Sequence, residues 1–141
     1  MNTAELSEEQ RRRIEHARAG VPFLKLLGIE VESVGQGTAA LVVHVREELM
    51  RNDGIVHGGV MASLIDSAFA FAIIPILDEG ERTVTVDMTI HYLRPVSNGA
   101  AKAVARVVRA GRRVITVSAE LFDENEKLAA TALSTYLRIT A

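Results

Sequence analysis

A single carboxylate stands in the middle of a long apolar segment. Asp66 is the only charged residue between His57 and Asp78, and the residues around it are aliphatic, aromatic or small. Burying an ionised carboxylate among apolar groups costs free energy unless hydrogen bonds or charges compensate it. Asp66 is therefore either a structural residue that pairs with a neighbouring group or a functional carboxylate in a cleft.

The residues that precede this segment, His57-Gly58-Gly59, could provide a second chemical group. If a helix begins here, the N–H groups of its first turn have no acceptor within the helix, and the helix dipole adds partial positive charge. Glycine also lets a ligand approach the backbone closely. We therefore expect Gly58 and Gly59 to present N–H groups that polarise a carbonyl or bind an oxyanion, although two glycines can equally serve only as a turn.

The spacing of these groups constrains how they could act together. Asp66 follows Gly58 by two helical turns, which places them about 12 Å apart along a helix axis. A ligand whose carbonyl meets the Gly58 N–H could reach Asp66 only if the start of the helix were unwound or the two residues came from different subunits.

Residues 60–76 have the length and composition of a buried helix. One side is an apolar stripe at helical spacing, formed by Met61, Leu64, Ile65, Ala68, Phe69 and Ala72. The other side is small or apolar rather than charged, formed by Ala62, Ser63, Asp66, Ala70 and Ile73. Because one sheet covers one face of a helix, we expect a second subunit to cover the other, which predicts a homodimer.

The rest of the chain predicts a short helical region followed mainly by strands. Ser7 is typical of an N-cap for a helix that ends near Ala19, and a shorter helical or coil segment over 23–27 ends at Gly28. Strands are expected at 29–34, 38–45, 83–93, 100–109, 113–122 and 127–139. In the third of these, alternation places Val84, Val86, Met88, Ile90 and Tyr92 on one face. Short turns favour antiparallel pairing, so we expect one α+β domain with a sheet around the long helix.

Composition excludes several classes of function. The net charge of −2 gives no electrostatic footprint for nucleic acid, and the absence of cysteine removes disulfides, Cys-based metal sites and thiol nucleophiles. His44 and His91 lack the spacing of metal ligands, so no metal site is expected. The N-terminus has no signal-peptide core, and the apolar stretch 68–77 is too short to span a membrane. We therefore expect a cytoplasmic protein without nucleic-acid or membrane partners.

Several segments, in their order along the chain, resemble one known family. The sequence NDGIVHGG at 52–59, followed by Leu64-Ile65-Asp66, resembles the N…G-x-x-H-G-G…D signature of the phenylacetate-pathway (PaaI-like) branch of hotdog acyl-CoA thioesterases, within the 4-hydroxybenzoyl-CoA thioesterase superfamily. The segment TVDMTIHYLRP at 85–95 resembles the long strand of that family, and 111–113 and 129–137 its turn and closing strand.

The resemblance implies a hotdog fold, in which an antiparallel sheet wraps around a long central helix. Residues 28–141 would form this core and residues 1–27 an extra N-terminal helical extension of the same domain. In the family, two subunits form a continuous sheet, the active site lies between them, and its carboxylate and glycine come from opposite subunits. A homotetramer built as a dimer of dimers is common.

The resemblance also implies a role for each residue of the motif. Asp66 would be the nucleophile or the general base in thioester hydrolysis, and the Gly58 N–H would bind the thioester oxygen. His57 and Asn52 would orient the carbonyl and the leaving thiolate, and the Thr85 hydroxyl would hold the hydrolytic water. The motif is one residue shorter here than in many family members between Asn52 and the histidine, so the adjacent Arg51 or Asp53 is an alternative at that position.

A further set of positions would contact the coenzyme A part of the substrate. These are Gly59, Tyr92, Leu93, Arg94, Pro95, Arg109, Gly111, Arg112 and Arg113. Arginines suit the phosphates of the nucleotide. Met61, Phe69 and Ile73 would form an apolar pocket for an aromatic, straight or branched acyl group. The thioester could be on coenzyme A or on an acyl-carrier protein, and no other cofactor is implied.

Two other functions fit parts of this pattern. Hotdog hydratases and dehydratases also use a histidine and a carboxylate, but their proline-rich signatures are missing from this chain. A non-catalytic acyl-CoA sensor is a third possibility, although the residues before Gly28 are too few for the DNA-binding domain of such sensors. Release of free thiol from acyl-CoA distinguishes the thioesterase from both.

Overall fold

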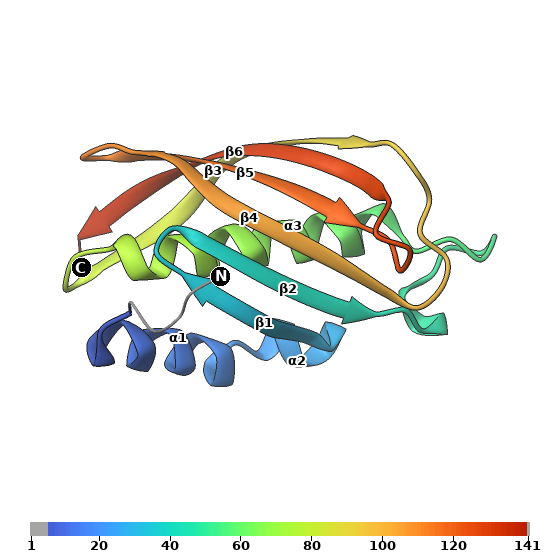
Figure 1. Cartoon of the computed structure of the whole chain (residues 1–141), viewed down its shortest axis with the longest axis horizontal. Helices are drawn as coiled ribbons and strands as arrows, with labels where there is room; N and C mark the ends of the chain where they lie inside the picture. Colours follow the sequence, from blue (N-terminus) through green and yellow to red (C-terminus); the bar gives the residue numbers. More distant parts are fainter. Residues whose placement is uncertain (1–5, 141) are drawn as a thin grey trace.

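A six-stranded antiparallel sheet curves around one central helix in this computed structural model, which describes residues 6–140 (Figure 1). The helix is α3 (Gly58–Ile73). The strands are β1 (Ile29–Gly35), β2 (Thr38–His44), β3 (Glu81–Tyr92), β4 (Ala100–Ala110), β5 (Val114–Phe122) and β6 (Leu128–Thr140), in the spatial order β1-β2-β4-β5-β6-β3. This confirms the predicted hotdog architecture of a sheet wrapped around a long helix.

The core lies between α3 and the concave face of the sheet. All six residues of the predicted apolar stripe are buried, and Phe69 and Leu64 are completely so. Alanines face the helix from β4, at Ala101, Ala103 and Ala105, and their small side chains leave room for the larger residues of α3. Each fully buried Leu or Phe contributes about 1.5–3 kcal/mol to folding, so this stripe fixes the helix against the sheet.

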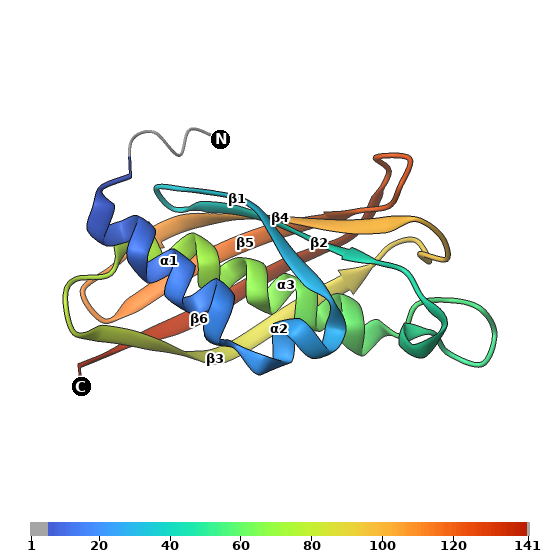
Figure 2. The ribbon, with the colours of Figure 1, turned by 90° about the horizontal axis from the view of Figure 1, so that it is seen from below.

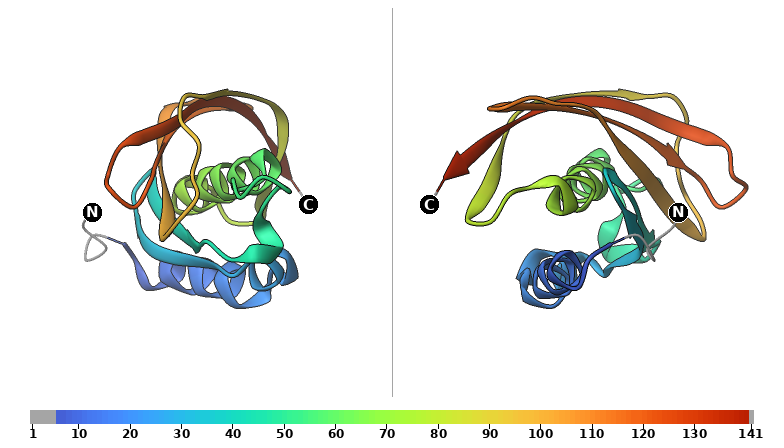
Figure 3. Two further views of the ribbon diagram at one scale, coloured as in Figure 1. Left: turned by 90° about the vertical axis from the view of Figure 1, so that its right-hand side faces the viewer. Right: turned by 60° about the vertical axis from the view of Figure 1, so that its left-hand side comes forward.

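The N-terminal helices lie on the side of α3 opposite the middle of the sheet and border the edge strand β1 (Figure 2 and Figure 3). Helix α1 (Glu8–Gly20) begins with a capping box in which Ser7 and Gln10 satisfy each other's backbone N–H groups. Helix α2 (Pro22–Leu27) ends at Gly28, whose φ of +73° is a left-handed conformation that favours glycine. These helices therefore occupy part of the space where a second subunit was expected, yet Ala62, Ser63 and Asp66 remain half-exposed.

Helix α1 is attached to the end of the central helix through two side chains. Helix α3 continues into a 3₁₀ turn, η3 (Ile74–Ile76), where Gln10 Nε2 donates to the Pro75 carbonyl at 2.7 Å. Arg13 donates to the Leu77 carbonyl at 2.9 Å. The helical run Gly58–Ile76 has the length and composition of a membrane span, but it is 56% buried in this fold, as expected of a core helix.

Strand β3 departs from the predicted alternation at one residue. Its register against β6 shifts between Thr85, opposite Tyr136, and Asp87, opposite Thr135, so that Val86 is a bulge. A bulge adds one residue to one strand and changes which side chains face inward. Met88 and Ile90 pack on the core as predicted. The prediction that Val84 and Val86 lie on the same face as Met88 and Ile90 is wrong. Val84 pairs with the exposed Leu137, and Val86 is the bulge residue without a partner on β6; both valines are exposed.

Candidate active site

The start of α3 is held by backbone hydrogen bonds to two separate segments. Val56 N–H donates to the Val96 carbonyl at 2.8 Å, and His57 N–H donates to the Leu49 carbonyl at 2.9 Å. Leu49, which ends the 3₁₀ turn η2 (Glu47–Leu49), is buried, so the loop before α3 is anchored in the core. These contacts fix where the helix begins and how its first N–H groups point.

His57 is the N-cap of α3 and occupies one of the two glycine N–H groups. Its Nδ1 accepts a hydrogen bond from the Gly59 N–H at 2.8 Å. Because Nδ1 is an acceptor, the proton of the neutral imidazole is on Nε2. The Gly58 N–H has no acceptor within residues 6–140. The expectation of two available N–H groups is therefore reduced to one, that of Gly58.

A hollow of about 370 Å³ lies beside Gly58. Its lining residues are Arg51, Ile55, Val56, Gly58, Met61, Tyr92, Leu93, Arg94 and Pro95. The Tyr92 hydroxyl donates to the Gly58 carbonyl at 2.8 Å, which joins the end of β3 to the start of α3. Four residues predicted to contact coenzyme A, Tyr92 to Pro95, are thus gathered at the predicted oxyanion-binding N–H.

Asp66 faces two hydroxyl groups from neighbouring strands. The Thr85 hydroxyl of β3 donates to Asp66 Oδ1 at 3.1 Å. The Tyr136 hydroxyl of β6 donates to the same Oδ1 and lies 3.0 Å from the Asp66 backbone carbonyl. Oδ2 has no hydrogen-bond partner within the described part of the chain. The carboxylate is therefore held by one oxygen and keeps the other available.

Tyr136 is the residue of this cluster that the sequence analysis missed. Its side chain is 3% exposed and packs edge-on against Phe69, with ring centroids 6.2 Å apart. Burial, and then the hydrogen bond to Asp66, raise the pKa of the Tyr136 phenol, so it remains a donor at neutral pH. A tyrosine in the inward register of β6, among alanines and a serine, was a usable signal, because a buried hydroxyl needs a partner.

The three candidates at the asparagine position are all exposed in the loop before α3. Arg51 and Asp53 form an ion pair at 2.8 Å. Of the three, Arg51 lines the hollow beside Gly58. Among the residues expected to form an acyl pocket, Met61 lines this hollow, whereas Phe69 and Ile73 are completely buried in the core.

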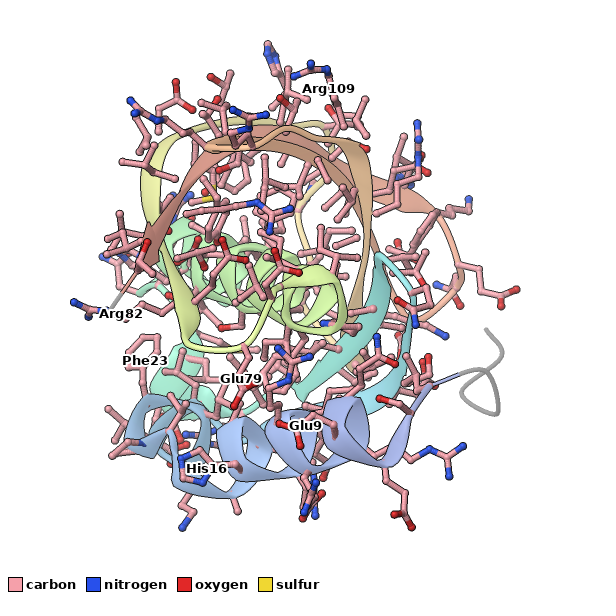
Figure 4. The ribbon with its side chains drawn as sticks, turned by 90° about the vertical axis from the view of Figure 1, so that its left-hand side faces the viewer. Glu9, His16, Phe23, Glu79, Arg82 and Arg109 are labelled. Carbon is pink, nitrogen blue, oxygen red and sulfur yellow. The ribbon has the colours of Figure 1, made fainter. Side chains whose placement is uncertain are left out.

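Arg109 and residues 111–113, which were also predicted to contact coenzyme A, lie at the other end of the sheet. The Gly111 carbonyl accepts from Arg138 Nε, and Arg138 also pairs with Glu81 at the start of β3. Gly58 lies at the end of β3, so the two groups are separated by the length of this strand, roughly 35 Å. Arg109, beside the β4–β5 turn, points away from the sheet into solvent (Figure 4). One chain therefore does not bring the two groups together.

Comparisons with known proteins agree with this architecture. Residues 53–130, more than half of the chain, match the family model described as the Thioesterase superfamily. The medium/long-chain acyl-CoA thioesterase YigI of Salmonella typhimurium is 30% identical over 132 residues, covering 83% of this chain and 85% of that protein. The chain belongs to the thioesterase superfamily. It is a PaaI-like thioester hydrolase.

Solved structures extend the similarity of this thioesterase over nearly the whole chain. The PaaI protein from the phenylacetic acid degradation operon of E. coli is 27% identical with a TM-score of 0.88, covering 97% of this chain and 98% of that one. A thioesterase from Haemophilus influenzae is 26% identical with a TM-score of 0.83, covering 90% of each chain. In residues 6–140 of the thioesterase, no group of three or more His, Cys, Asp or Glu side chains could hold a metal ion.

Proposed function

We propose that this thioesterase hydrolyses acyl-CoA thioesters to a free carboxylic acid and coenzyme A, with Asp66 as the reactive carboxylate. The observation that supports this most directly is the Asp66 side chain, whose Oδ1 accepts from Thr85 and Tyr136 while Oδ2 has no partner in the described chain. A carboxylate arranged in this way can attack a carbonyl or remove a proton from water. The name of the relative YigI supports coenzyme A as the carrier.

Two routes of hydrolysis are compatible with this geometry. In one, Asp66 Oδ2 attacks the thioester carbonyl, the thiolate leaves, and water hydrolyses the resulting anhydride. In the other, Oδ2 removes a proton from a water molecule that attacks the carbonyl directly. In both, the Gly58 N–H stabilises the oxyanion, and His57, together with Asn52 or the adjacent Arg51, orients the carbonyl and thiolate. While Thr85 donates to Oδ1, its hydroxyl oxygen can still accept a hydrogen bond from that water.

The proposed site requires two subunits. Asp66 and Gly58 lie about 12 Å apart along one helix, so one thioester cannot contact both in the same chain. Within residues 6–140, β3 pairs with β6 on one side only and is an edge strand, and exposed edges favour pairing with another strand. Antiparallel pairing of β3 with its copy would make one continuous sheet and a homodimer, two of which would form a homotetramer.

The same pairing would unite the two groups of coenzyme A contacts. Antiparallel β3 strands place the start of one strand beside the end of the other, so Arg109 and 111–113 of one subunit would approach 92–95 of its partner. We further propose that the chain acts as a single cytoplasmic domain without a cofactor, coenzyme A being part of the substrate.

Thiol release from a panel of aromatic, straight and branched acyl-CoAs tests this function. Wild type should hydrolyse at least one group, and Asp66→Asn should lower kcat by about a thousandfold or more while still accepting hydrogen bonds from Tyr136 and Thr85. Asp87→Asn is the matched control, because the Asp87 carboxylate accepts from the Thr135 N–H and takes no part in the site. Binding without hydrolysis across the panel would favour a sensor, and near-normal turnover by Asp66→Asn would exclude this mechanism.

A further inference from the structure

The hydroxyl of Tyr136 reaches Asp66 from the far side of the core. Tyr136 belongs to β6 and Asp66 to the middle of α3, and 70 residues separate them in the chain. The ring is buried and packed edge-on against Phe69, so it has little freedom to turn away. The carboxylate thus meets a donor whose position is set by the core of the protein.

We propose that Tyr136 is a positioning residue for catalysis, which fixes Asp66 Oδ1 so that Oδ2 is the oxygen presented to the thioester or to water. The proposal rests on the function proposed for Asp66. It adds a residue from the last strand to a site that is otherwise formed by α3, the loop before it and β3.

Three contacts around Asp66 support a role beyond packing. The Asp66 backbone carbonyl lies 3.0 Å from the Tyr136 hydroxyl and would by itself be a sufficient acceptor for its proton. The hydroxyl nevertheless also lies within hydrogen-bonding distance of Oδ1. Hydrogen bonds to a charged acceptor are stronger than those to a neutral one, so the proton favours the carboxylate. Thr85, the register partner of Tyr136, approaches the same oxygen from β3.

The two donors differ in how firmly they are held. The Thr85 bond to Oδ1 is 3.1 Å long, whereas the Tyr136 ring is buried and packed against Phe69. Burial raises the pKa of the Tyr136 phenol, which keeps it protonated over the pH range of an assay. Among described residues, Tyr136 is the one titratable side chain that hydrogen-bonds Asp66, and α3 has no other charged residue. Of the two hydroxyl groups that donate to Asp66 Oδ1, that of Tyr136 is therefore held more firmly.

Tyr136→Phe tests the proposal, since it removes the hydroxyl and keeps the ring. We expect kcat to fall about tenfold with little change in KM, because Tyr136 is buried and does not line the hollow beside Gly58. The acidic limb of kcat/KM against pH should move up by about one pH unit, because the ionised carboxylate loses a donor. An unchanged limb together with unchanged kcat would overturn the proposal.

Ser134→Ala is the matched control. Ser134 is buried, lies two residues before Tyr136 on the same face of β6, and its hydroxyl donates to the Asp87 carbonyl at 2.5 Å. Its loss should lower stability and leave the acidic limb in place. If Ser134→Ala moves the limb as far as Tyr136→Phe does, the effect is structural and the proposal fails.

A spectroscopic measurement covers the case in which Tyr136→Phe does not fold. The chain has two tyrosines and no tryptophan, so Tyr92→Phe leaves Tyr136 as the sole phenol. Adding Asp66→Asn to that variant should lower the pH at which the remaining tyrosine ionises, followed by its absorbance. No change would contradict the contact. If Asp66→Asn keeps its activity, the proposed function fails; if Asp66→Asn is inactive and Tyr136→Phe behaves as wild type, only the positioning role fails.

Discussion

The Nδ1 atom of His57 accepts the backbone N–H of Gly59 at 2.8 Å. This hydrogen bond caps α3, while the N–H of Gly58, a residue that lines the adjoining hollow, has no acceptor within residues 6–140. It also places the imidazole proton on Nε2, where it can donate to a substrate. The contact therefore assigns different tasks to two adjacent glycines.

Replacing Gly58 by proline should remove the oxyanion donor without removing the helix. Gly58 is the first residue of α3, a position where proline is favoured, and His57 has the extended backbone that precedes proline readily. We expect kcat to fall about a hundredfold or more, measured by thiol release. Gly58→Ala keeps the N–H, and its added Cβ would meet the Tyr92 ring at an ordinary 3.5 Å. Equal losses in the two variants would show that the N–H is not involved.

Mixing two inactive variants tests whether the site is shared between subunits. In a heterodimer of Asp66→Asn and Gly58→Pro, one site combines both changes and the other has neither, provided that Asp66 and Gly58 come from opposite chains. The purified heterodimer should therefore show about half of wild-type activity. The measurement is thiol release after co-expression and purification through two different tags. No recovery in a verified heterodimer would mean that each site lies within one chain.

Thr85→Val should lower kcat while leaving KM nearly unchanged. The substitution keeps the shape of the side chain and removes the donor to Asp66 Oδ1 and the acceptor for water. We expect a loss of about tenfold to a hundredfold in kcat. Thr83→Val, two residues earlier on the same strand, is the control and should retain turnover. Similar kinetics for the two variants would remove Thr85 from the mechanism.

Substitution of Arg112 and Arg113 by glutamine should raise KM for acyl-CoA about tenfold and leave kcat nearly constant, because these exposed arginines would bind nucleotide phosphates. The effect should diminish with a dephospho-CoA thioester, which has fewer charges. Arg12→Gln is the control, since Arg12 pairs with Glu9 on the surface of α1. An unaltered KM would place the nucleotide elsewhere.

Stability should fall at alkaline pH because of Tyr136. Burial, and then the hydrogen bond to Asp66, raise the pKa of its phenol in the folded state, whereas an unfolded tyrosine ionises near pH 10. Above about pH 10 the unfolded chain loses this proton and the folded chain keeps it, so the free energy of unfolding decreases as pH rises. Denaturant unfolding between pH 8 and 11 should show a smaller decline for Tyr136→Phe. Tyr92→Phe should keep most of the decline, because Tyr92 is 50% exposed.

The parts of this fold that follow from local patterns were predictable. The stripe of α3 from Met61 to Ala72 predicted its buried face, because helical spacing alone decides which residues share a side. The cap at Ser7 and the end of α2 at Gly28 were likewise local. Gly58 and residues 92–95 lie together because the end of β3 meets the start of α3, where the Tyr92 hydroxyl donates to the Gly58 carbonyl.

What the sequence analysis missed depends on contacts between distant segments. The bulge at Val86 exists only in the register of β3 against β6, so strict alternation assigned Val84 and Val86 to the wrong face. Tyr136 meets Asp66 across 70 residues, which no local spacing reports. The position of α1 was also missed, because it depends on hydrogen bonds from Gln10 and Arg13 to the carbonyls of Pro75 and Leu77, more than 60 residues away in the chain.

The bulge at Val86 also limits how β3 can change in length during evolution. Deleting Val86 itself would leave Thr85 opposite Tyr136 and Asp87 opposite Thr135, so the side chains on both sides of the bulge would keep their faces. Removing or adding a residue elsewhere in β3 would shift the pairings beyond that point by one residue and reverse the faces of their side chains. A single-codon deletion is therefore tolerable at Val86, whereas elsewhere in the strand it would separate Thr85 from Asp66 or move Met88 out of the core.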